Sequence, residues 1–176
     1  SLSFLAATLV MSISFLMIVV SSYKSNSFQK IIIFLASCGY AFPGTILAVG
    51  IVVFVGWLNK LIHFHVSYFI GGFMVLMFAY TIRFLAVGNG AIRSGVMRIH
   101  PNLMDASRTM GVNFFQSLRR IIFPLVYTNI LVGGILVFVD ILKELPITLL
   151  LRPFNFETLA TYVYQYASDE LLEESS

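Results

Sequence analysis

The chain has 176 residues, of which 59% are hydrophobic and only 11% are charged, and its formal net charge is +3. A soluble domain usually carries about 25% charged residues. The composition therefore excludes an ordinary soluble globular protein and indicates that a lipid bilayer is the solvent. The single cysteine, Cys38, excludes an internal disulfide and a site built from several thiolates. We expect it to be a small packing residue.

Four apolar stretches are candidates for membrane-spanning helices, since a span takes about 20 mostly apolar residues. They cover about residues 2–20, 43–58, 66–87 and 121–142. Within lipid every backbone polar group must be paired inside its own segment, so these stretches are expected to be helical. The sequence thus predicts an all-α, polytopic transmembrane helical bundle that forms one domain over residues 1–176.

The second stretch contains a break. Ile31 to Leu58 is free of charge but includes Pro43-Gly44. Proline lacks an amide hydrogen and disfavours helix in the residue before it. We predict a short interfacial or re-entrant helix at about residues 29–40, followed by the span at 43–58. One long helix with a proline kink is the alternative.

The distribution of charge gives an orientation, because positive residues gather on the cytoplasmic side. The segment from Arg83 to Arg120 holds six arginines and a single acid, Asp105. We therefore place the loop at about residues 88–120 in the cytoplasm. The N-terminus and the acidic stretch after Leu142 then lie outside, with an amphipathic segment at about 157–168. We expect a further span to follow this segment.

The cytoplasmic loop has the pattern of two short helices. Asn102 can cap the first helix, and Gly111 suits a left-handed helix end. One face of this first helix holds small or apolar residues at helical spacing, namely Leu103, Ala106, Ser107 and Met110. A second helix is expected to begin after Asn113 and to lead through Pro124 into the fourth span.

Two interpretations of the first helix follow from its residues. A small-faced, rigid helix fits a groove on a cytosolic partner. Alternatively, it lies on the membrane as an interfacial amphipathic helix, with the arginines near anionic headgroups. The residues alone favour neither.

The spacing of this loop resembles the EAA loop of ABC-importer permeases, whose pattern is E-A-A-x3-G-x9-I-x-L-P. The residues at the positions of that pattern are Asp105, Ala106, Ser107, Gly111, Ile121, Phe123 and Pro124, with Asp for Glu, Ser for Ala and Phe for Leu. The resemblance implies that the loop docks on a cytosolic ABC ATPase dimer. The coupling residues would be Leu103, Asp105, Ala106, Ser107, Met110, Gly111, Ile121 and Pro124.

Three other segments, residues 39–50, 80–88 and 138–170, resemble the C-terminal half of ferric-iron-type permeases. The resemblance implies a type I ABC importer permease in a bacterial inner membrane. Its expected partners are a second permease half or subunit and a periplasmic or extracellular binding protein that delivers Fe3+. Close relatives of that family carry thiamine, polyamines or sulfate, so these substrates are alternatives.

Three ionisable residues gather near the outer end of the fourth span, namely Asp140, Lys143 and Glu144. At offsets of three and four residues they share one helical face. Charged groups at membrane depth are costly and usually face a cavity or one another. They are candidates for an outer gate or a contact with the loaded binding protein. A local ion pair that ends the span before Pro146 is the alternative.

The sequence contains no phosphate-binding loop, hydrolase motif or zinc-protease motif. His63 and His65 are two residues apart and have no third ligand near them, so we expect no metal site and no cofactor. We expect no enzyme, with ATP hydrolysis on a partner subunit, and no nucleic-acid partner. Two other classes stay open: a non-transport membrane scaffold, and an intramembrane enzyme that uses Asp140 and the histidines.

Overall fold

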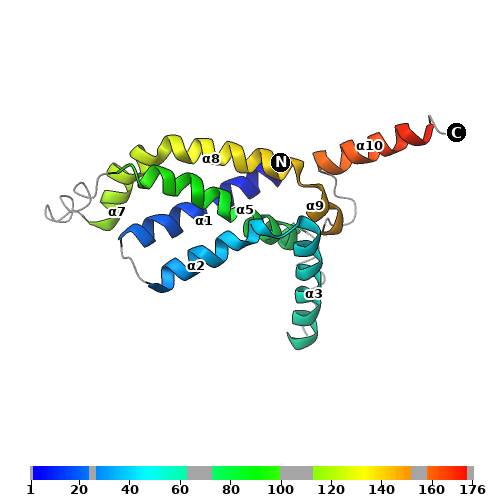
Figure 1. Ribbon diagram of the computed structural model, residues 1–176, viewed down its shortest axis with the longest axis horizontal. Helices are drawn as coiled ribbons and strands as arrows, with labels where there is room; N and C mark the ends of the chain where they lie inside the picture. Colours follow the sequence, from blue (N-terminus) through cyan, green and yellow to red (C-terminus); the bar gives the residue numbers. More distant parts are fainter. Residues whose placement is uncertain (1, 24–26, 63–72, 100–112, 152–157, 174–176) are drawn as a thin grey trace.

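The computed structural model describes residues 2–23, 27–62, 73–99, 113–151 and 158–173. All the regular elements in these ranges are helices, which confirms the all-α fold (Figure 1). The elements are α1 (Leu2–Tyr23), α2 (Ser27–Cys38), the 3-10 helix η1 (Gly39–Ala41), α3 (Gly44–Ile62), α5 (Phe73–Val96), α7 (Phe114–Ser117), the π-helix η2 (Leu118–Ile122), α8 (Phe123–Lys143), α9 (Leu145–Leu151) and α10 (Leu159–Glu173).

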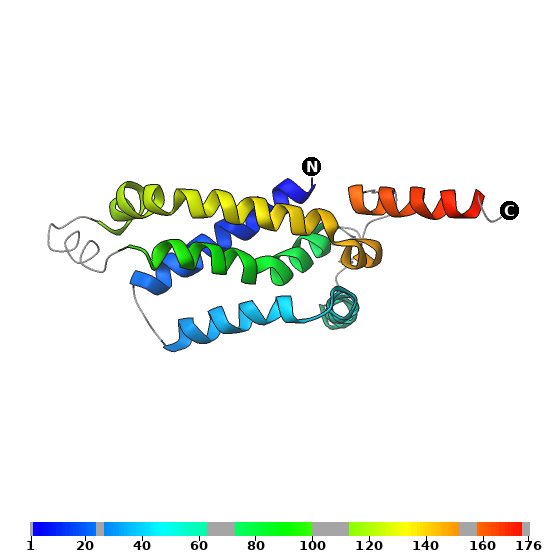
Figure 2. The same cartoon turned by 45° about the horizontal axis from the view of Figure 1, so that its top comes forward.

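Helices α1, α5 and α8 pack side by side, and α2 runs along them on one side (Figures 1 and 2). Small and branched side chains fill the space between the three helices, among them Ala6, Val10, Ile92, Val126 and Val137. Most of the outward-facing side chains are also apolar, as expected of helices that face lipid. In the described part of the chain three helices have the length and composition of membrane spans, and α2 with α3 forms a bent fourth candidate.

Close packing of α8 depends on Gly133. A Cβ atom added there would lie 2.6 Å from the Cβ of Ala91 on α5 and 2.9 Å from Cε of Met11 on α1. The neighbouring Gly134 has more room, since its added Cβ would meet nothing closer than Cγ of Met11 at 3.8 Å. Small residues of this kind let transmembrane helix backbones approach closely.

The break at Pro43 is larger than a proline kink, because the α2–η1 segment and α3 meet at 116°. Phe42 is extended, with φ −82° and ψ 138°, as expected before a proline. The two helices lie close to the predicted bounds of 29–40 and 43–58. The segment that runs back along the bundle is α2, whereas α3 begins at Gly44 and leaves the bundle (Figures 1 and 2).

The structure describes part of the predicted cytoplasmic segment at residues 88–120. Helix α5 continues to Val96, and α7 begins at Phe114, where the carbonyl of Asn113 accepts the amides of Gln116 and Ser117. The π-helix η2 precedes Pro124, and its last bond joins the Phe123 amide to the Leu118 carbonyl. Proline cannot donate the bond that would continue a regular ladder, which accounts for the irregular turn at this point.

The predicted amphipathic segment at 157–168 corresponds to α10, which projects beyond the end of α8 (Figure 1). Thr158 and Thr161 form its N-terminal cap, because the Thr158 amide donates to Oγ1 of Thr161 at 2.9 Å. The apolar stripe of Leu159, Tyr162, Val163 and Tyr166 is exposed. It has no cover from the described part of the chain.

Several predicted features lie outside the described residues. They are the start of the span predicted at residues 66–87, the histidines His63, His65 and His100, and the predicted docking helix with Leu103, Asp105, Ala106, Ser107, Met110 and Gly111. Ile121 and Pro124 are described.

Gly133→Ala should destabilise the bundle by about 1–3 kcal/mol, because the added methyl group collides with Ala91 and overpacks a tight helix contact. The matched control is Gly134→Ala, which makes the same chemical change one residue along. Thermal unfolding in detergent should show a lowered Tm for the first variant alone. Equal Tm values for the two variants would contradict the close approach at Gly133.

Candidate functional site: a buried ion pair where four segments meet

Arg83 lies on α5 between the apolar residues Ile82 and Phe84, and it bonds to the turn after α8 and to the break before α3. Its Nε donates to Oε2 of Glu144 at 3.1 Å, which forms a salt bridge to the residue between α8 and α9. Its Nη1 donates to the carbonyl oxygen of Phe42, at the break before α3. Both side chains of the pair are largely shielded, at 17% and 9% exposure. Shielding from water strengthens this attraction.

Two aromatic rings complete the surroundings of Arg83. The guanidinium carbon lies 5.9 Å from the ring centroid of Tyr40 on η1 and 5.9 Å from that of Phe84 on α5. The same two rings meet edge to face, with 6.4 Å between their centroids. Cation–π contacts at this range contribute to holding a guanidinium in one place.

Glu144 is buried and has left the helix. Helix α8 ends at Lys143, and Glu144 has φ −77° and ψ 92°. Its Oε1 has no hydrogen-bond partner among the described residues and lies against Gly44, where any side chain would collide with it. Gly44 begins α3, whose first amides carry the positive end of the helix dipole. The carboxylate therefore lies between the Arg83 guanidinium and the start of α3.

A short hydroxyl chain extends the cluster into α9. The Thr148 hydroxyl donates to the carbonyl oxygen of Glu144, and it also contacts the Tyr80 hydroxyl of α5. Both hydroxyls are satisfied when Tyr80 donates to Thr148. Tyr80 and Thr148 are fully buried, so these bonds fix α9 against α5. We call Arg83, Glu144, Tyr80, Thr148 and Tyr40 the junction cluster.

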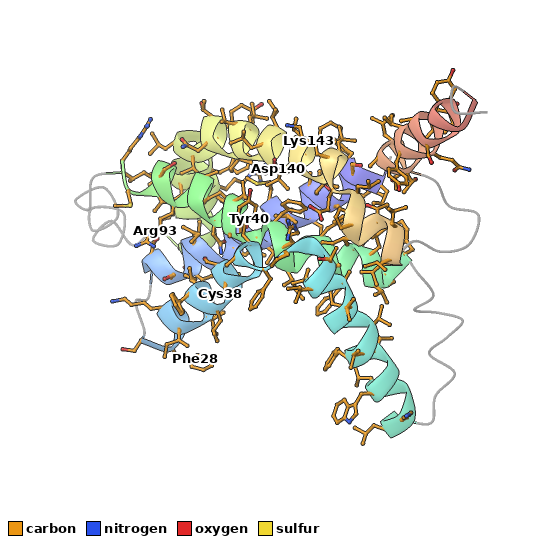
Figure 3. The ribbon with its side chains drawn as sticks, turned by 45° about the vertical axis from the view of Figure 1, so that its right-hand side comes forward. Phe28, Cys38, Tyr40, Arg93, Asp140 and Lys143 are labelled. Atoms are coloured by element: carbon orange, nitrogen blue, oxygen red, sulfur yellow. The ribbon has the colours of Figure 1, made fainter. Side chains whose placement is uncertain are left out.

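The structure divides the three residues that were predicted to share one helical face. Asp140 is half-buried on α8 and Lys143 is exposed, while Glu144 turns inward to α5. Figure 3 shows Asp140 and Lys143 on α8, toward the opposite end of the bundle from Arg93. The predicted local ion pair is therefore wrong for Glu144, whose partner is Arg83. The physical reason is that the helix ends before Glu144, two residues ahead of Pro146.

The sequence signal for the junction cluster was a lone arginine inside an apolar span. Such an arginine requires an anion at the same depth. The charge distribution alone groups Arg83 with the other arginines of residues 83–120 and does not identify its partner. The aromatic and hydroxyl members carried no signal that separates them from ordinary span residues. Of the predicted coupling residues that the structure describes, Ile121 is half-buried in η2 and Pro124 lies in the first turn of α8, both at the opposite end of the bundle.

Among the described residues no three His, Cys, Asp or Glu side chains lie close enough together to hold a metal ion. The junction cluster offers one carboxylate, which is already paired with a guanidinium. It forms a structural contact between α5 and the turn after α8.

Comparison with known proteins identifies the family. Residues 13–167 match the family model described as the inner membrane component of binding-protein-dependent transport systems. The chain belongs to this family. It is thus a multi-pass membrane permease component of binding-protein-dependent transport, and the family consists of transport components.

Two relatives of this chain carry names that refer to ferric-iron transport. An Fe(3+)-transport system permease protein of Haemophilus influenzae is 26% identical over 131 residues, which cover 74% of this chain and 24% of that protein. A ferric transport system permease protein of Actinobacillus pleuropneumoniae is 25% identical over 141 residues, covering 76% and 20%. The matched part of the permease thus spans only about a fifth to a quarter of these relatives.

Glu144→Gln or Arg83→Gln should destabilise the permease by about 3 kcal/mol, since either change leaves a shielded charge without its partner. The double variant should cost less than the sum of the two single variants. A double-mutant cycle from denaturation in detergent measures this coupling. The control is Asp140→Asn, which should change stability by less than about 0.5 kcal/mol. Additive effects of the two variants would argue against a direct pair.

Proposed function

We propose that this permease is the membrane-spanning part of an ATP-driven importer that couples to a separate cytosolic ATPase. The observation that carries the proposal is the family match over residues 13–167, which includes the polar loop between α5 and α7. The EAA-like spacing from Asp105 to Pro124 supports this loop as the docking surface for the ATPase.

The packing of α5 and α8 supports a mechanism for coupling. The proposed docking loop connects the end of α5 to α7, η2 and α8, and α5 and α8 lie side by side along the bundle (Figure 2). A displacement of the loop when the ATPase closes on ATP would therefore act on both helices at once. Because packed helices move as rigid units, the displacement would reach the far end of the bundle.

The junction cluster at that far end is our candidate for the outer gate. The Arg83–Glu144 pair ties α5 to the start of α9 and to the break before α3. When α5 moves relative to α8 and α9, this contact must adapt or break, so two arrangements of the bundle would differ there. Asp140 and Lys143, which are more accessible, are candidates for contact with a substrate-loaded binding protein.

The proposed substrate is ferric iron, delivered by a binding protein and passed between this chain and a second permease half or subunit. The names of the two relatives support the substrate. We place the protein in a bacterial inner membrane, with the arginine-rich end in the cytoplasm.

Ala106→Glu should uncouple ATP hydrolysis from transport, because a charged side chain replaces a methyl group on the face proposed to enter the ATPase groove. In proteoliposomes with the full transporter, we expect the transport rate to fall at least tenfold. The stimulation of ATP hydrolysis by the loaded binding protein should fall to the same extent. The control is Arg108→Glu, which introduces the same side chain away from that face. Normal transport and ATPase stimulation by Ala106→Glu would reject the docking assignment.

Cells that express the full-length parent should accumulate labelled Fe3+ above the level of cells that lack it. Uptake of labelled thiamine and polyamine in the same cells serves as the control for substrate. A gain in thiamine or polyamine uptake without iron uptake would support the assignment as an importer and would contradict ferric iron as its substrate. No uptake of any of them, with no ATPase bound in detergent pull-down, would favour a membrane scaffold.

A further inference from the structure

A cavity lies at the arginine-rich end of the bundle, away from the junction cluster. It has a volume of about 550 Å3, is partly open and is lined by α1, α2 and the end of α5. Lys30 and Arg93 line it together with Ser21, while Ile33, Phe34 and Met97 supply apolar walls. Figure 3 shows Arg93 toward the end of the bundle where α2 begins. The volume falls within the usual range of small-ligand sites.

The two cations of this cavity have no counter-charge in the described part of the chain. The salt bridge of the described residues lies elsewhere, at the junction cluster, between Arg83 and Glu144. The acids with described side chains, Asp140 and Glu144, belong to the opposite end of α8 and the turn after it. Arg98, Arg119 and Arg120 add further positive charge at the same end as the cavity. The field in the cavity therefore favours an anion.

The hydroxyl groups show which donors an anion would use. Ser22 and Ser37 already donate to the carbonyl oxygens one turn earlier, at Ile18 and Ile33. Lys30, Arg93 and the Ser21 hydroxyl are thus the groups left to donate. An ammonium and a guanidinium on neighbouring helices are typical partners of a phosphate group.

The apolar walls indicate that the anion carries hydrocarbon. Beside this cavity, a second groove of about 280 Å3 lies between α1 and α2. It is lined by Leu16, Val20 and Ile32, and it shares Ile33 with the cavity. A dissolved phosphate would gain nothing from such walls, whereas a lipid would place its phosphate at the cations and its acyl chain along the groove. Basic pockets between helices on the cytoplasmic side suit anionic lipid headgroups.

We propose that the cavity formed by α1, α2 and α5 binds the phosphate headgroup of an anionic phospholipid of the inner leaflet. Lys30 and Arg93 hold the phosphate, and Phe34 and Ile33 contact the adjoining hydrocarbon. The lipid would thereby fill the space between α1 and α2, near the point where α5 runs into the proposed docking loop. Its occupancy would influence how α5 responds to that loop.

A tryptophan reporter tests the proposal directly. Trp57 is the single tryptophan of the chain and lies on α3, so Trp57→Phe removes the background signal. Phe34→Trp then places a reporter in the cavity at a side chain that is 69% exposed and tolerant of change. In nanodiscs that contain the 176-residue chain, brominated phosphatidylglycerol should quench this tryptophan at least about threefold more than brominated phosphatidylcholine at equal content. Equal quenching by the two lipids would overturn the proposal.

Matched charge variants separate a specific site from general attraction. In the reporter background, Lys30→Gln with Arg93→Gln should abolish the preference for phosphatidylglycerol, with an affinity loss of about tenfold. Arg119→Gln with Arg120→Gln removes the same charge from the same end and should leave the preference within about twofold. An equal loss in both pairs would overturn the site.

A competition experiment separates the lipid from a soluble anion. Inorganic phosphate or glycerophosphoglycerol, added at millimolar concentration, should leave the quenching by brominated phosphatidylglycerol unchanged. Displacement by either would assign the cavity to a soluble anion and overturn the lipid proposal. If the charge variants fail to fold, the comparison of the two brominated lipids in the otherwise unaltered cavity still decides it.

Discussion

The arrangement of the permease depends on one constraint, which is that Arg83 carries a full positive charge inside an apolar helix. In lipid such a charge is costly unless an anion and hydrogen-bond acceptors lie beside it. Glu144 supplies the anion, the Phe42 carbonyl supplies a further acceptor, and two aromatic rings cover the guanidinium. These partners come from separate parts of the chain. Satisfying one side chain therefore fixes where α3 and α9 meet α5.

The same constraint explains why the chain tolerates a sharp break at membrane depth. A helix interrupted by proline leaves carbonyl groups without amide partners, and lipid cannot hydrogen-bond to them. Here the Phe42 carbonyl at the break accepts a bond from Arg83. Gly39, just before it, packs so closely on the Ile82 backbone that a side chain has no room. The turn is thus held against α5, and its 116° angle is set by these contacts.

Much of the fold follows from local pattern. The apolar runs predict helices where α1, α5 and α8 lie, and Pro43 predicts the break before α3. Asn113 marks the start of the helix before the fourth span. The pairing of Glu144 with Arg83 was not predicted. The prediction treated Glu144 as helical and placed it on the same face as Asp140, whereas α8 ends at Lys143. The direction of α3 could not be predicted either, since proline determines that a helix breaks and tertiary contacts determine where the next one points.

The junction cluster depends on the shape of the Arg83 guanidinium as well as on its charge. Nε and Nη1 lie in one plane and donate in different directions, toward the Glu144 carboxylate and toward the Phe42 carbonyl. A lysine at the same position carries the charge but has neither the planar fork nor the same contact with the rings of Tyr40 and Phe84. A lysine could still pair with Glu144, but it would lose the hydrogen bond to the Phe42 carbonyl before α3. The arginine thus links the ion pair and the bend in one group, so that neither can change without the other.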